Sequence, residues 1–440
     1  MFVIGTAGHV DHGKSALVRA LTGIDPDRLP EEKAREMTID LGFAWLRLPS
    51  GIETSIVDVP GHERFLRNML AGVGGINLAL LVVAADEGVM PQTREHLAVL
   101  DLLDVKHGVL VITKKDLVDD DWLELVAADV REVVAGTCLA QAPLVPCSAV
   151  TGEGLEELLA IIAAELARVP PPRDVGRPRL TIDRVFTVAG FGTVVTGTLI
   201  DGSLAVGQEV DVLPGGLRAR IRGLQTHRQK IERALPGSRT AVNLAGLSPD
   251  ELSRGMVVTT PGWLSPTTAV DVRLRAVSYL PHPIRHNLHV TFYTGAAEVE
   301  GTVRLLDRDA LGPGEDGWAQ VRLAEPVAVV RGDGFIIRTP NDTVGGGKVV
   351  DIHALRHRRR HEPTLRALAA LQEGSPQEAL AALLARLEPC DLATLEGQSS
   401  FSPDEVRAAV KGLLAAGRIV ALGGNILHTQ PTRARAPTQW

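Results

Sequence analysis

Residues 8–15 read Gly-His-Val-Asp-His-Gly-Lys-Ser and follow the apolar run FVIGTAG, which begins at Phe2. Their spacing is that of a phosphate-binding loop, GxxxxGK[ST], and the helix-forming stretch ALVRALTG comes directly after them. Glycines in such a loop let main-chain amides turn inward around a phosphate, and the helix N-terminus adds a partial positive charge. We therefore predict that a strand, this loop and a helix open the fold and bind phosphate.

Phosphate and metal ligands follow from this motif and from DVPGHE at residues 58–63, after the strand-like run SIVDV. Lys14 would neutralise the β- and γ-phosphates, Ser15 would ligate Mg²⁺, and Asp58 would reach the metal through water. His62 stands where it can orient the attacking water, which makes it the candidate catalytic residue. The predicted phosphate contacts are Gly8, Val10, Asp11, His12, Gly13, Lys14, Ser15, Ala16 and Gly61.

A candidate conformational switch lies between these two motifs, in residues 36–43, EMTIDLGF. Thr38 can complete the Mg²⁺ shell only when a γ-phosphate is present, because the metal then bridges nucleotide and protein. We therefore predict that this segment distinguishes GTP from GDP.

The base-reading element is Thr113-Lys114-Lys115-Asp116, which follows the apolar run VLVIT. Asp116 can accept hydrogen bonds from N1 and N2 of guanine, a pair that adenine does not supply. Leaving such a polar group unpaired against the wrong base should give selectivity on the order of 10⁴-fold. Ser148 and Ala149 fit the supporting loop. The predicted guanine contacts are Thr113, Lys114, Asp116, Ser148 and Ala149.

Composition describes an ordinary globular chain of 440 residues, 45% hydrophobic and 22% charged. With 3% aromatic residues and a net charge of −7, any contact with nucleic acid should depend on local Arg and Lys. Three cysteines without metal-ligand spacing favour the reducing cytoplasm. The first apolar run is too short to cross a bilayer, so we expect no membrane span.

The residue pattern predicts four domains. Residues 1–172 alternate β-branched runs with helical stretches, which is typical of a parallel α/β sheet. Short strands with Gly-rich turns predict antiparallel β-barrels at residues 173–262 and 263–355. Helical stretches followed by the hairpin sequence IVALGGNILH predict a winged helix at residues 356–430, and Ser402 with Glu405 has capping-box spacing. Residues 431–440 form a tail without apolar periodicity.

Together these stretches resemble translational GTPases of the elongation factor Tu type. Within that class the chain is most similar to bacterial selenocysteine-specific elongation factors. The stretches that carry the resemblance include TAGHVDHGK, MTIDLGFAW, DVPGHERFLRNMLAGVGGI, IDRVFTVAGFGTVVTGT and GGGKVVD. Within TKKD, Thr113 stands where general elongation factors usually have Asn.

The resemblance implies that the chain, with GTP, GDP and Mg²⁺ as ligands, delivers selenocysteinyl-tRNA to a ribosome paused at a recoded UGA codon. Hydrolysis of GTP would release the tRNA. The family's aminoacyl pocket maps onto Asp183, Arg184 and Arg239. A selenol is largely anionic near neutral pH, so two arginines would favour it over a seryl group. A structural ion pair involving Asp183 is the alternative interpretation.

Two basic segments are further candidates for RNA contact. Arg218, Arg220 and Arg222 alternate along one predicted strand, where tRNA phosphates or solvent could face them. For the basic run at residues 356–360, we favour RNA.

Two departures from the family pattern matter. Glu36 replaces the Gly that normally precedes the Met-Thr pair, and if that position needs a positive φ it should cost about 1–2 kcal/mol and reduce GTPase activation. Family members carry tandem winged helices, the last of which hold the mRNA hairpin, whereas one unit fits here. The chain is then a shortened form or a fragment, or another molecule reads the hairpin.

Two other functions share part of this pattern. One is a general or initiator aminoacyl-tRNA carrier, against which the winged helix and Arg239 argue. The other is an RNA-binding regulator that binds GTP without turnover, against which His62 and Thr38 argue. We expect a monomer.

Overall fold

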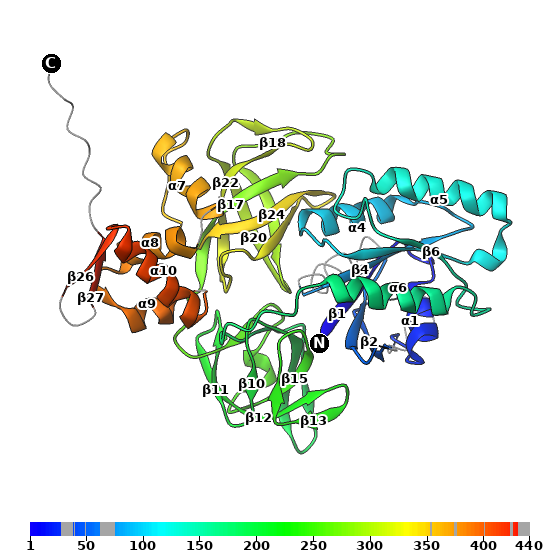
Figure 1. The fold of residues 1–440 in the computed structure, drawn as a ribbon, viewed down its shortest axis with the longest axis horizontal. Helices are drawn as coiled ribbons and strands as arrows, with labels where there is room; N and C mark the ends of the chain where they lie inside the picture. The colour runs from blue at the N-terminus through cyan, green and yellow to red at the C-terminus, as the bar shows by residue number, and fades with distance from the viewer. Residues whose placement is uncertain are drawn as a thin grey trace.

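The computed structural model describes residues 1–27, 38, 40–48, 50–61, 75–352, 354–373, 376–399, 401–422 and 426–429. Figure 1 shows an N-terminal α/β domain beside two β-rich domains, with the helices α8, α9 and α10 at the end of the molecule away from α5. No helix in the described ranges has the length and apolar character needed to span a membrane.

The N-terminal domain is built on a six-stranded sheet of order β2-β3-β1-β4-β5-β6, in which β2 and β3 pair antiparallel and the other pairs are parallel. Buried runs such as LALLVVA explain the central strands, because both faces of the sheet are covered. The elements are β1 (Phe2–Gly8), α1 (Lys14–Thr22), β2 (Gly42–Arg47), β3 (Glu53–Asp58), β4 (Leu78–Ala84), α4 (Pro91–Leu102), β5 (Gly108–Thr113), α5 (Asp120–Val134), β6 (Leu144–Pro146) and α6 (Leu155–Arg168).

The carboxyl ends of β1, β3, β5 and β6 meet at one edge of this sheet. The predicted phosphate loop follows β1, Asp58 ends β3, and Thr113 ends β5. In open parallel sheets this edge is where ligands bind. The topology therefore gathers the predicted nucleotide residues in one place.

The first barrel closes through the strand order β11-β16-β7-β9-β15-β12, with β12 pairing back to β11. Its inward side chains alternate with outward ones, as in the pattern RTAVNLA of β15. The strands are β7 (Arg179–Thr181), β8 (Arg184–Val188), β9 (Gly192–Ile200), β10 (Leu204–Ala205), β11 (Glu209–Leu213), β12 (Leu217–Thr226), β13 (Gln229–Ile231), β14 (Arg233–Ala234), β15 (Arg239–Ala245) and β16 (Val257–Thr259).

The second barrel closes as β17-β22-β20-β19-β23-β24, so the prediction of two antiparallel barrels is confirmed. Phe292 and Phe335 stack inside it with ring centroids 5.2 Å apart. The strands are β17 (Thr267–Ala276), β18 (Ile284–Arg285), β19 (Leu288–Thr294), β20 (Ala297–Leu305), β21 (Ala310–Leu311), β22 (Asp316–Val327), β23 (Gly334–Arg338) and β24 (Thr343–Asp351).

The C-terminal domain combines helices with a small sheet of order β25-β27-β26, an arrangement that matches a winged helix. The Ser402–Glu405 capping box forms as predicted, with Ser402 Oγ accepting from the Glu405 amide. The elements are α7 (Glu362–Glu373), α8 (Pro376–Leu387), β25 (Cys390–Asp391), α9 (Leu392–Gln398), α10 (Pro403–Ala415), β26 (Ile419–Leu422) and β27 (Ile426–Thr429). The sequence did not predict α9, whose seven residues carry little periodicity.

Part of the basic run at residues 356–360 contacts the second barrel. Arg359 donates to the Leu305 carbonyl and to Asp309, and Arg360 also donates to Asp309. His357 Nε2 lies 2.6 Å from the fully buried Asp271 carboxylate. These side chains fasten the start of the C-terminal domain to the barrel, whereas Arg356 and Arg358 are exposed, and the contact of this run with RNA stays a prediction.

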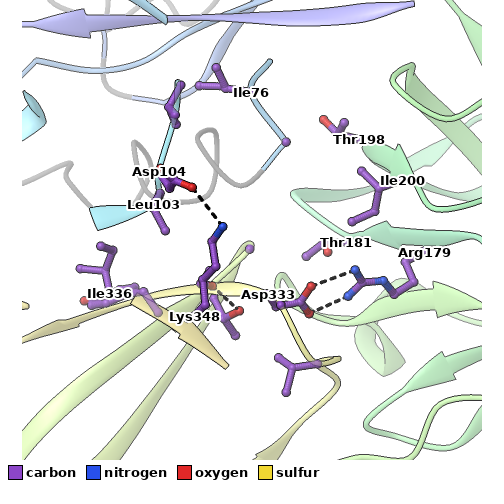
Figure 2. A pocket seen from close by; sticks show the side chains of 18 of the residues that line it. Ile76, Leu103, Asp104, Arg179, Thr181, Thr198, Ile200, Asp333, Ile336 and Lys348 are labelled. Atoms are coloured by element: carbon purple, nitrogen blue, oxygen red, sulfur yellow. Dashed lines mark hydrogen bonds and ion pairs between the residues drawn. The ribbon is translucent and has the colours of Figure 1, made fainter. Parts of the chain in front are cut away.

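Three domains meet around a cavity of about 520 Å³. Figure 2 shows the ion pairs at its wall: Arg179 joins Asp333 of the second barrel, and Lys348 of that barrel joins Asp104 of the N-terminal domain. Arg179 also pairs with Asp201, and both of its carboxylate partners lie within 2.6 Å. These pairs fix the barrels against each other and against the sheet.

Candidate nucleotide site and aminoacyl pocket

The phosphate loop has the backbone that its glycines predict. Gly13 adopts φ 78° immediately before α1, and Gly8 adopts φ 139°, where an added Cβ would lie 2.2 Å from the Val82 carbonyl. Lys14 is 5% exposed, and its Nζ donates to the His9 carbonyl at 2.5 Å. Burial lowers the pKa of Lys14 to about 8. Phosphate oxygens would favour its charged form again.

Gly61 lies against the same loop. A Cβ there would meet Lys14 Nζ at 2.5 Å and the Val10 amide at 2.6 Å. The main chain at Gly61 therefore comes as close to the loop as only glycine permits, which suits an amide that senses the terminal phosphate.

Two amides that the sequence assigned to phosphate are engaged elsewhere. The Gly8 amide donates to His96 Nδ1 at 2.9 Å, and the Val10 amide donates to Gln92 Oε1 at 3.2 Å. Gln92 and His96 are four residues apart on α4, so they share one helix face. Gly8 and Val10 thus brace the loop on α4, and the predicted phosphate contacts of this loop stay predictions.

The predicted metal ligands converge. Ser15 Oγ lies 2.8 Å from Thr38 Oγ1 and donates to Asp58 Oδ2 at 2.6 Å. Adjacent ligands of an octahedral Mg²⁺ with bonds of about 2.1 Å stand roughly 3 Å apart, so the two hydroxyls fit this ion. Among the described residues no group of three His, Cys, Asp or Glu could hold a metal. Ser15 and Thr38 are the two predicted metal ligands whose hydroxyl oxygens the structure brings together.

Asp58 is fully buried, and burial raises the pKa of its carboxyl group. Hydrogen bonds from Ser15 and Thr6 oppose this shift, since both donate to the ionised form. Thr38 Oγ1 also donates to Asp27 Oδ1 at 2.8 Å. Asp27 and Thr6 were not predicted from the sequence, because nothing in their local sequence marks them as neighbours of a metal.

The base-reading loop is tied to the phosphate loop through Thr113. Its hydroxyl donates to the His12 carbonyl at 2.7 Å, and the side chain is 2% exposed. Lys114 has φ 56° and pairs with Asp86 at 3.0 Å, while Asp116 is exposed at the start of a single helical turn. The exposed Asp116 carboxylate is thus available to a base in the site.

The supporting loop is ordered by its own serine. Ser148 Oγ accepts from the amides of Val150 and Thr151 at 3.2 and 3.1 Å. The Lys115 amide donates to the Cys147 carbonyl, which joins this loop to the base-reading loop. Ala149 is half-buried in between.

The three predicted pocket residues form one cluster in the first barrel. Arg239 Nη2 donates to Asp183 Oδ1 at 2.8 Å, and Thr196 Oγ1 donates to the same oxygen at 2.6 Å. Arg184 begins β8 directly after Asp183. The ion pair that the sequence left as an alternative does form, and it holds one of the two guanidinium groups in place.

The N-terminal domain supplies the other wall of this cluster. Arg184 donates through Nε to Asp40 at 2.9 Å and through Nη2 to the Leu41 carbonyl at 2.6 Å. The Arg239 guanidinium carbon lies 3.4 Å from the centroid of the Phe43 ring. These contacts across domains could not be read from the sequence, although Asp40 and Phe43 stand inside the MTIDLGF stretch.

Two predictions lie outside the described residues. They concern His62 as the residue that orients water, and the effect of Glu36 in the switch segment. The other predicted site residues fall in two groups: the nucleotide residues at the edge of the sheet, and the pocket where β2 meets the first barrel.

Family models match three segments of the chain. The elongation factor Tu GTP-binding domain matches residues 1–168, elongation factor Tu domain 2 matches residues 192–259, and the β-barrel domain of selenocysteine-specific elongation factors matches residues 268–356. Curated selenocysteine-specific elongation factors are 47% identical over 384 residues in Desulfomicrobium baculatum and 39% identical over 390 residues in Escherichia coli K12.

Each of these two alignments covers 87% of this chain, and the chain spans about 60% of the length of either relative. Among solved structures, a bacterial selenocysteine-specific elongation factor has a TM-score of 0.85 at 30% identity, covering 98% of this chain and 69% of its own. Elongation factor SelB of Methanococcus maripaludis, in complex with the GTP analogue GppNHp, has a TM-score of 0.71 at 26% identity, covering 80% and 79%.

Proposed function

This chain belongs to the selenocysteine-specific elongation factors of the elongation factor Tu type, and we propose that it carries selenocysteinyl-tRNA as a GTP-dependent factor. In this proposal the GTP-bound form delivers the tRNA to the ribosome at a recoded UGA codon in the cytoplasm. Hydrolysis of GTP to GDP and phosphate then releases it. The protein acts as a monomer.

One observation carries the substrate assignment: Arg184 and Arg239 lie together beside Asp183, at the joint between the barrel and β2. Arg184 is 29% exposed and Arg239 is 17% exposed, so a small side chain on a tRNA terminus could reach both. Two guanidinium groups stabilise an anionic selenolate through charge-assisted hydrogen bonds and do much less for a neutral hydroxyl.

The nucleotide residues support the role of GTP as the switch. Lys14 would neutralise the β- and γ-phosphates, and Ser15, Thr38 and a water held by Asp58 would surround Mg²⁺. When bound, the metal would neutralise charge that develops on the phosphates. Asp116 would select guanine. Thr38 is the ligand that depends on the γ-phosphate, so it separates the two nucleotide states.

Protection of the aminoacyl ester tests the carrier function. We expect the GTP-bound protein to slow deacylation of selenocysteinyl-tRNA, and we expect Arg239→Gln to lose most of that protection while it still binds GTP. Equal protection by wild type and Arg239→Gln would contradict the pocket assignment.

Turnover tests the GTPase function and separates it from a regulator that binds GTP without hydrolysing it. We expect ribosomes to stimulate hydrolysis by the wild type, and we expect His62→Ala to retain GTP affinity and lose the stimulation. Unchanged turnover in His62→Ala would remove this residue from its role, and the absence of any turnover in the wild type would favour the regulator.

A further inference from the structure

We propose that Asp40 is a positioning residue that couples the binding of Thr38 at the metal site to the arginines of the aminoacyl pocket. Through it, the pocket would hold a selenolate tightly in the GTP-bound form and weakly after hydrolysis. This inference rests on the proposed function and adds the residue through which the nucleotide state reaches the pocket.

The first step is the contact itself. Asp40 Oδ2 accepts from Arg184 Nε at 2.9 Å and lies 2.6 Å from Nη2, and Nη2 also donates to the Leu41 carbonyl. These contacts engage Nε and Nη2 of the guanidinium group, so Nη1 is the nitrogen that would bind an anionic ligand. Arg184 itself lies over the Phe43 ring, at 5.1 Å from its centroid. The orientation of Arg184 therefore depends on the N-terminal domain.

The second step is the path from the metal. Thr38 and Asp40 are two residues apart, so about 7 Å of extended chain at most separates their Cα atoms. Strand β2 begins at Gly42, directly after them, and its Phe43 packs on Arg239. Because a single residue lies between Thr38 and Asp40, a large movement of Thr38 away from Ser15 would also displace Asp40.

The third step is charge. In this conformation Asp40 and Asp183 balance the two arginines, and Asp183 is 9% exposed and held inside the first barrel. Asp183 therefore does not depend on the nucleotide, whereas Asp40 belongs to the segment that senses it. Loss of Asp40 from Arg184 would free a long side chain with many rotamers, and ordering it again costs free energy when the ligand binds.

The test measures the affinity for selenocysteinyl-tRNA in the presence of a non-hydrolysable GTP analogue and in the presence of GDP. The ratio of the two affinities is compared among the wild type, Asp40→Asn, Asp40→Glu and Asp104→Asn. Asp104→Asn is the matched control, because Asp104 also makes an ion pair between domains, with Lys348 at 3.3 Å, and is not one of the pocket residues. Seryl-tRNA on the same tRNA body is measured in parallel.

We expect Asp40→Asn to lower the ratio about five- to tenfold, within the usual range of coupling between two sites. Asp40→Glu should recover part of the loss because it keeps the charge, and Asp104→Asn should keep the wild-type ratio. A wild-type ratio in Asp40→Asn, or an equal loss in Asp104→Asn, would overturn the coupling and leave the proposed function intact. A wild type that does not distinguish selenocysteinyl-tRNA from seryl-tRNA would overturn the proposed function and the coupling with it.

Discussion

Arg239 of the first barrel lies over the ring of Phe43 of the N-terminal domain, with 3.4 Å between the guanidinium carbon and the ring centroid. The pair joins a predicted ligand of the selenol to the last residue of the switch segment, which lies in strand β2. A cation over an aromatic ring is worth about 0.5–2 kcal/mol, depending on how far it is desolvated. The contact therefore has the strength to influence how the pocket forms.

We predict that Phe43→Leu weakens the binding of selenocysteinyl-tRNA to the GTP-bound protein about three- to tenfold, because leucine keeps the apolar packing and removes the ring. Equilibrium binding to labelled selenocysteinyl-tRNA measures the change. Phe191→Leu is the control, since Lys230 lies over that ring at 5.4 Å elsewhere on the barrel. The same loss in both variants would argue against a specific role for Phe43.

Thr113→Val should weaken the binding of GTP and the binding of GDP equally, by about five- to thirtyfold. Valine has the shape of threonine but cannot donate to the His12 carbonyl, and a lost buried hydrogen bond costs roughly 1–2 kcal/mol. Fluorescent analogues of the two nucleotides provide the measurement. Thr113→Ser, which retains the hydroxyl, should stay close to the wild type. An effect on GTP alone would show that the hydroxyl acts on the γ-phosphate and not on the base loop.

Thr38→Ala should change the Mg²⁺ requirement of GTP binding and leave that of GDP binding unchanged. Its hydroxyl lies 2.8 Å from Ser15 Oγ, where it would ligate Mg²⁺ in the presence of a γ-phosphate. We predict that the Mg²⁺ concentration needed for half-maximal GTP binding rises about tenfold and that the requirement for GDP does not change. Titration of Mg²⁺ with each nucleotide tests this. Thr38→Ser should restore the wild-type behaviour, and an equal rise for both nucleotides would contradict the assignment.

Two buried histidines, His12 in the phosphate loop and His96 on α4, predict a loss of stability in acid. Burial lowers the pKa of His96 to about 3 and that of His12 to about 4, against an ordinary value of 6.5. At these two histidines, the folded and the unfolded chain bind nearly equal numbers of protons well above pH 6.5. As the pH falls below 6.5, the unfolded chain binds more protons there than the folded chain does. The contribution of these two histidines to the free energy of unfolding is therefore fully present well above pH 6.5, and it falls as the pH decreases towards their folded-state pKa values.

We predict that local unfolding of β1 and α4 becomes easier by up to about 1.4 kcal/mol per pH unit for each histidine between pH 6 and pH 4. Native-state hydrogen exchange, corrected for its intrinsic pH dependence, measures this slope. His96→Gln should reduce the slope because glutamine does not titrate. The exposed His282→Gln serves as the control, and a slope that His96→Gln leaves unchanged would contradict the prediction.

Local sequence patterns were sufficient to predict many of the structural elements of this protein. GHVDHGKS determined the loop around Lys14, and period-two alternation such as that of Arg218, Arg220 and Arg222 marked the barrel strands; all three of these side chains are exposed on β12. The capping box at Ser402 marked the start of α10. Each of these features depends on residues within one turn or strand, where spacing alone carries the information.

Contacts between distant segments escaped prediction. The bond from the Gly8 amide to His96 spans 88 residues, and the Arg184–Asp40 pair spans 144. Such contacts depend on how helices, strands and domains pack against each other. The spacing of residues along the sequence carries no information about that packing. Gln92 and His96 were nevertheless visible as a polar pair four residues apart, and their shared helix face was the one available sign that α4 supports the loop.

The decisive measurement for the pocket compares the affinity of the GTP-bound protein for selenocysteinyl-tRNA with its affinity for seryl-tRNA on the same tRNA body. Only selenium and oxygen differ between the two ligands, so the ratio reports how the Arg184 and Arg239 pair treats a selenolate and a hydroxyl. Charge-assisted hydrogen bonds are roughly twice as strong as neutral ones, and we predict that the selenocysteinyl form binds at least about tenfold more tightly. Equal affinities would contradict it.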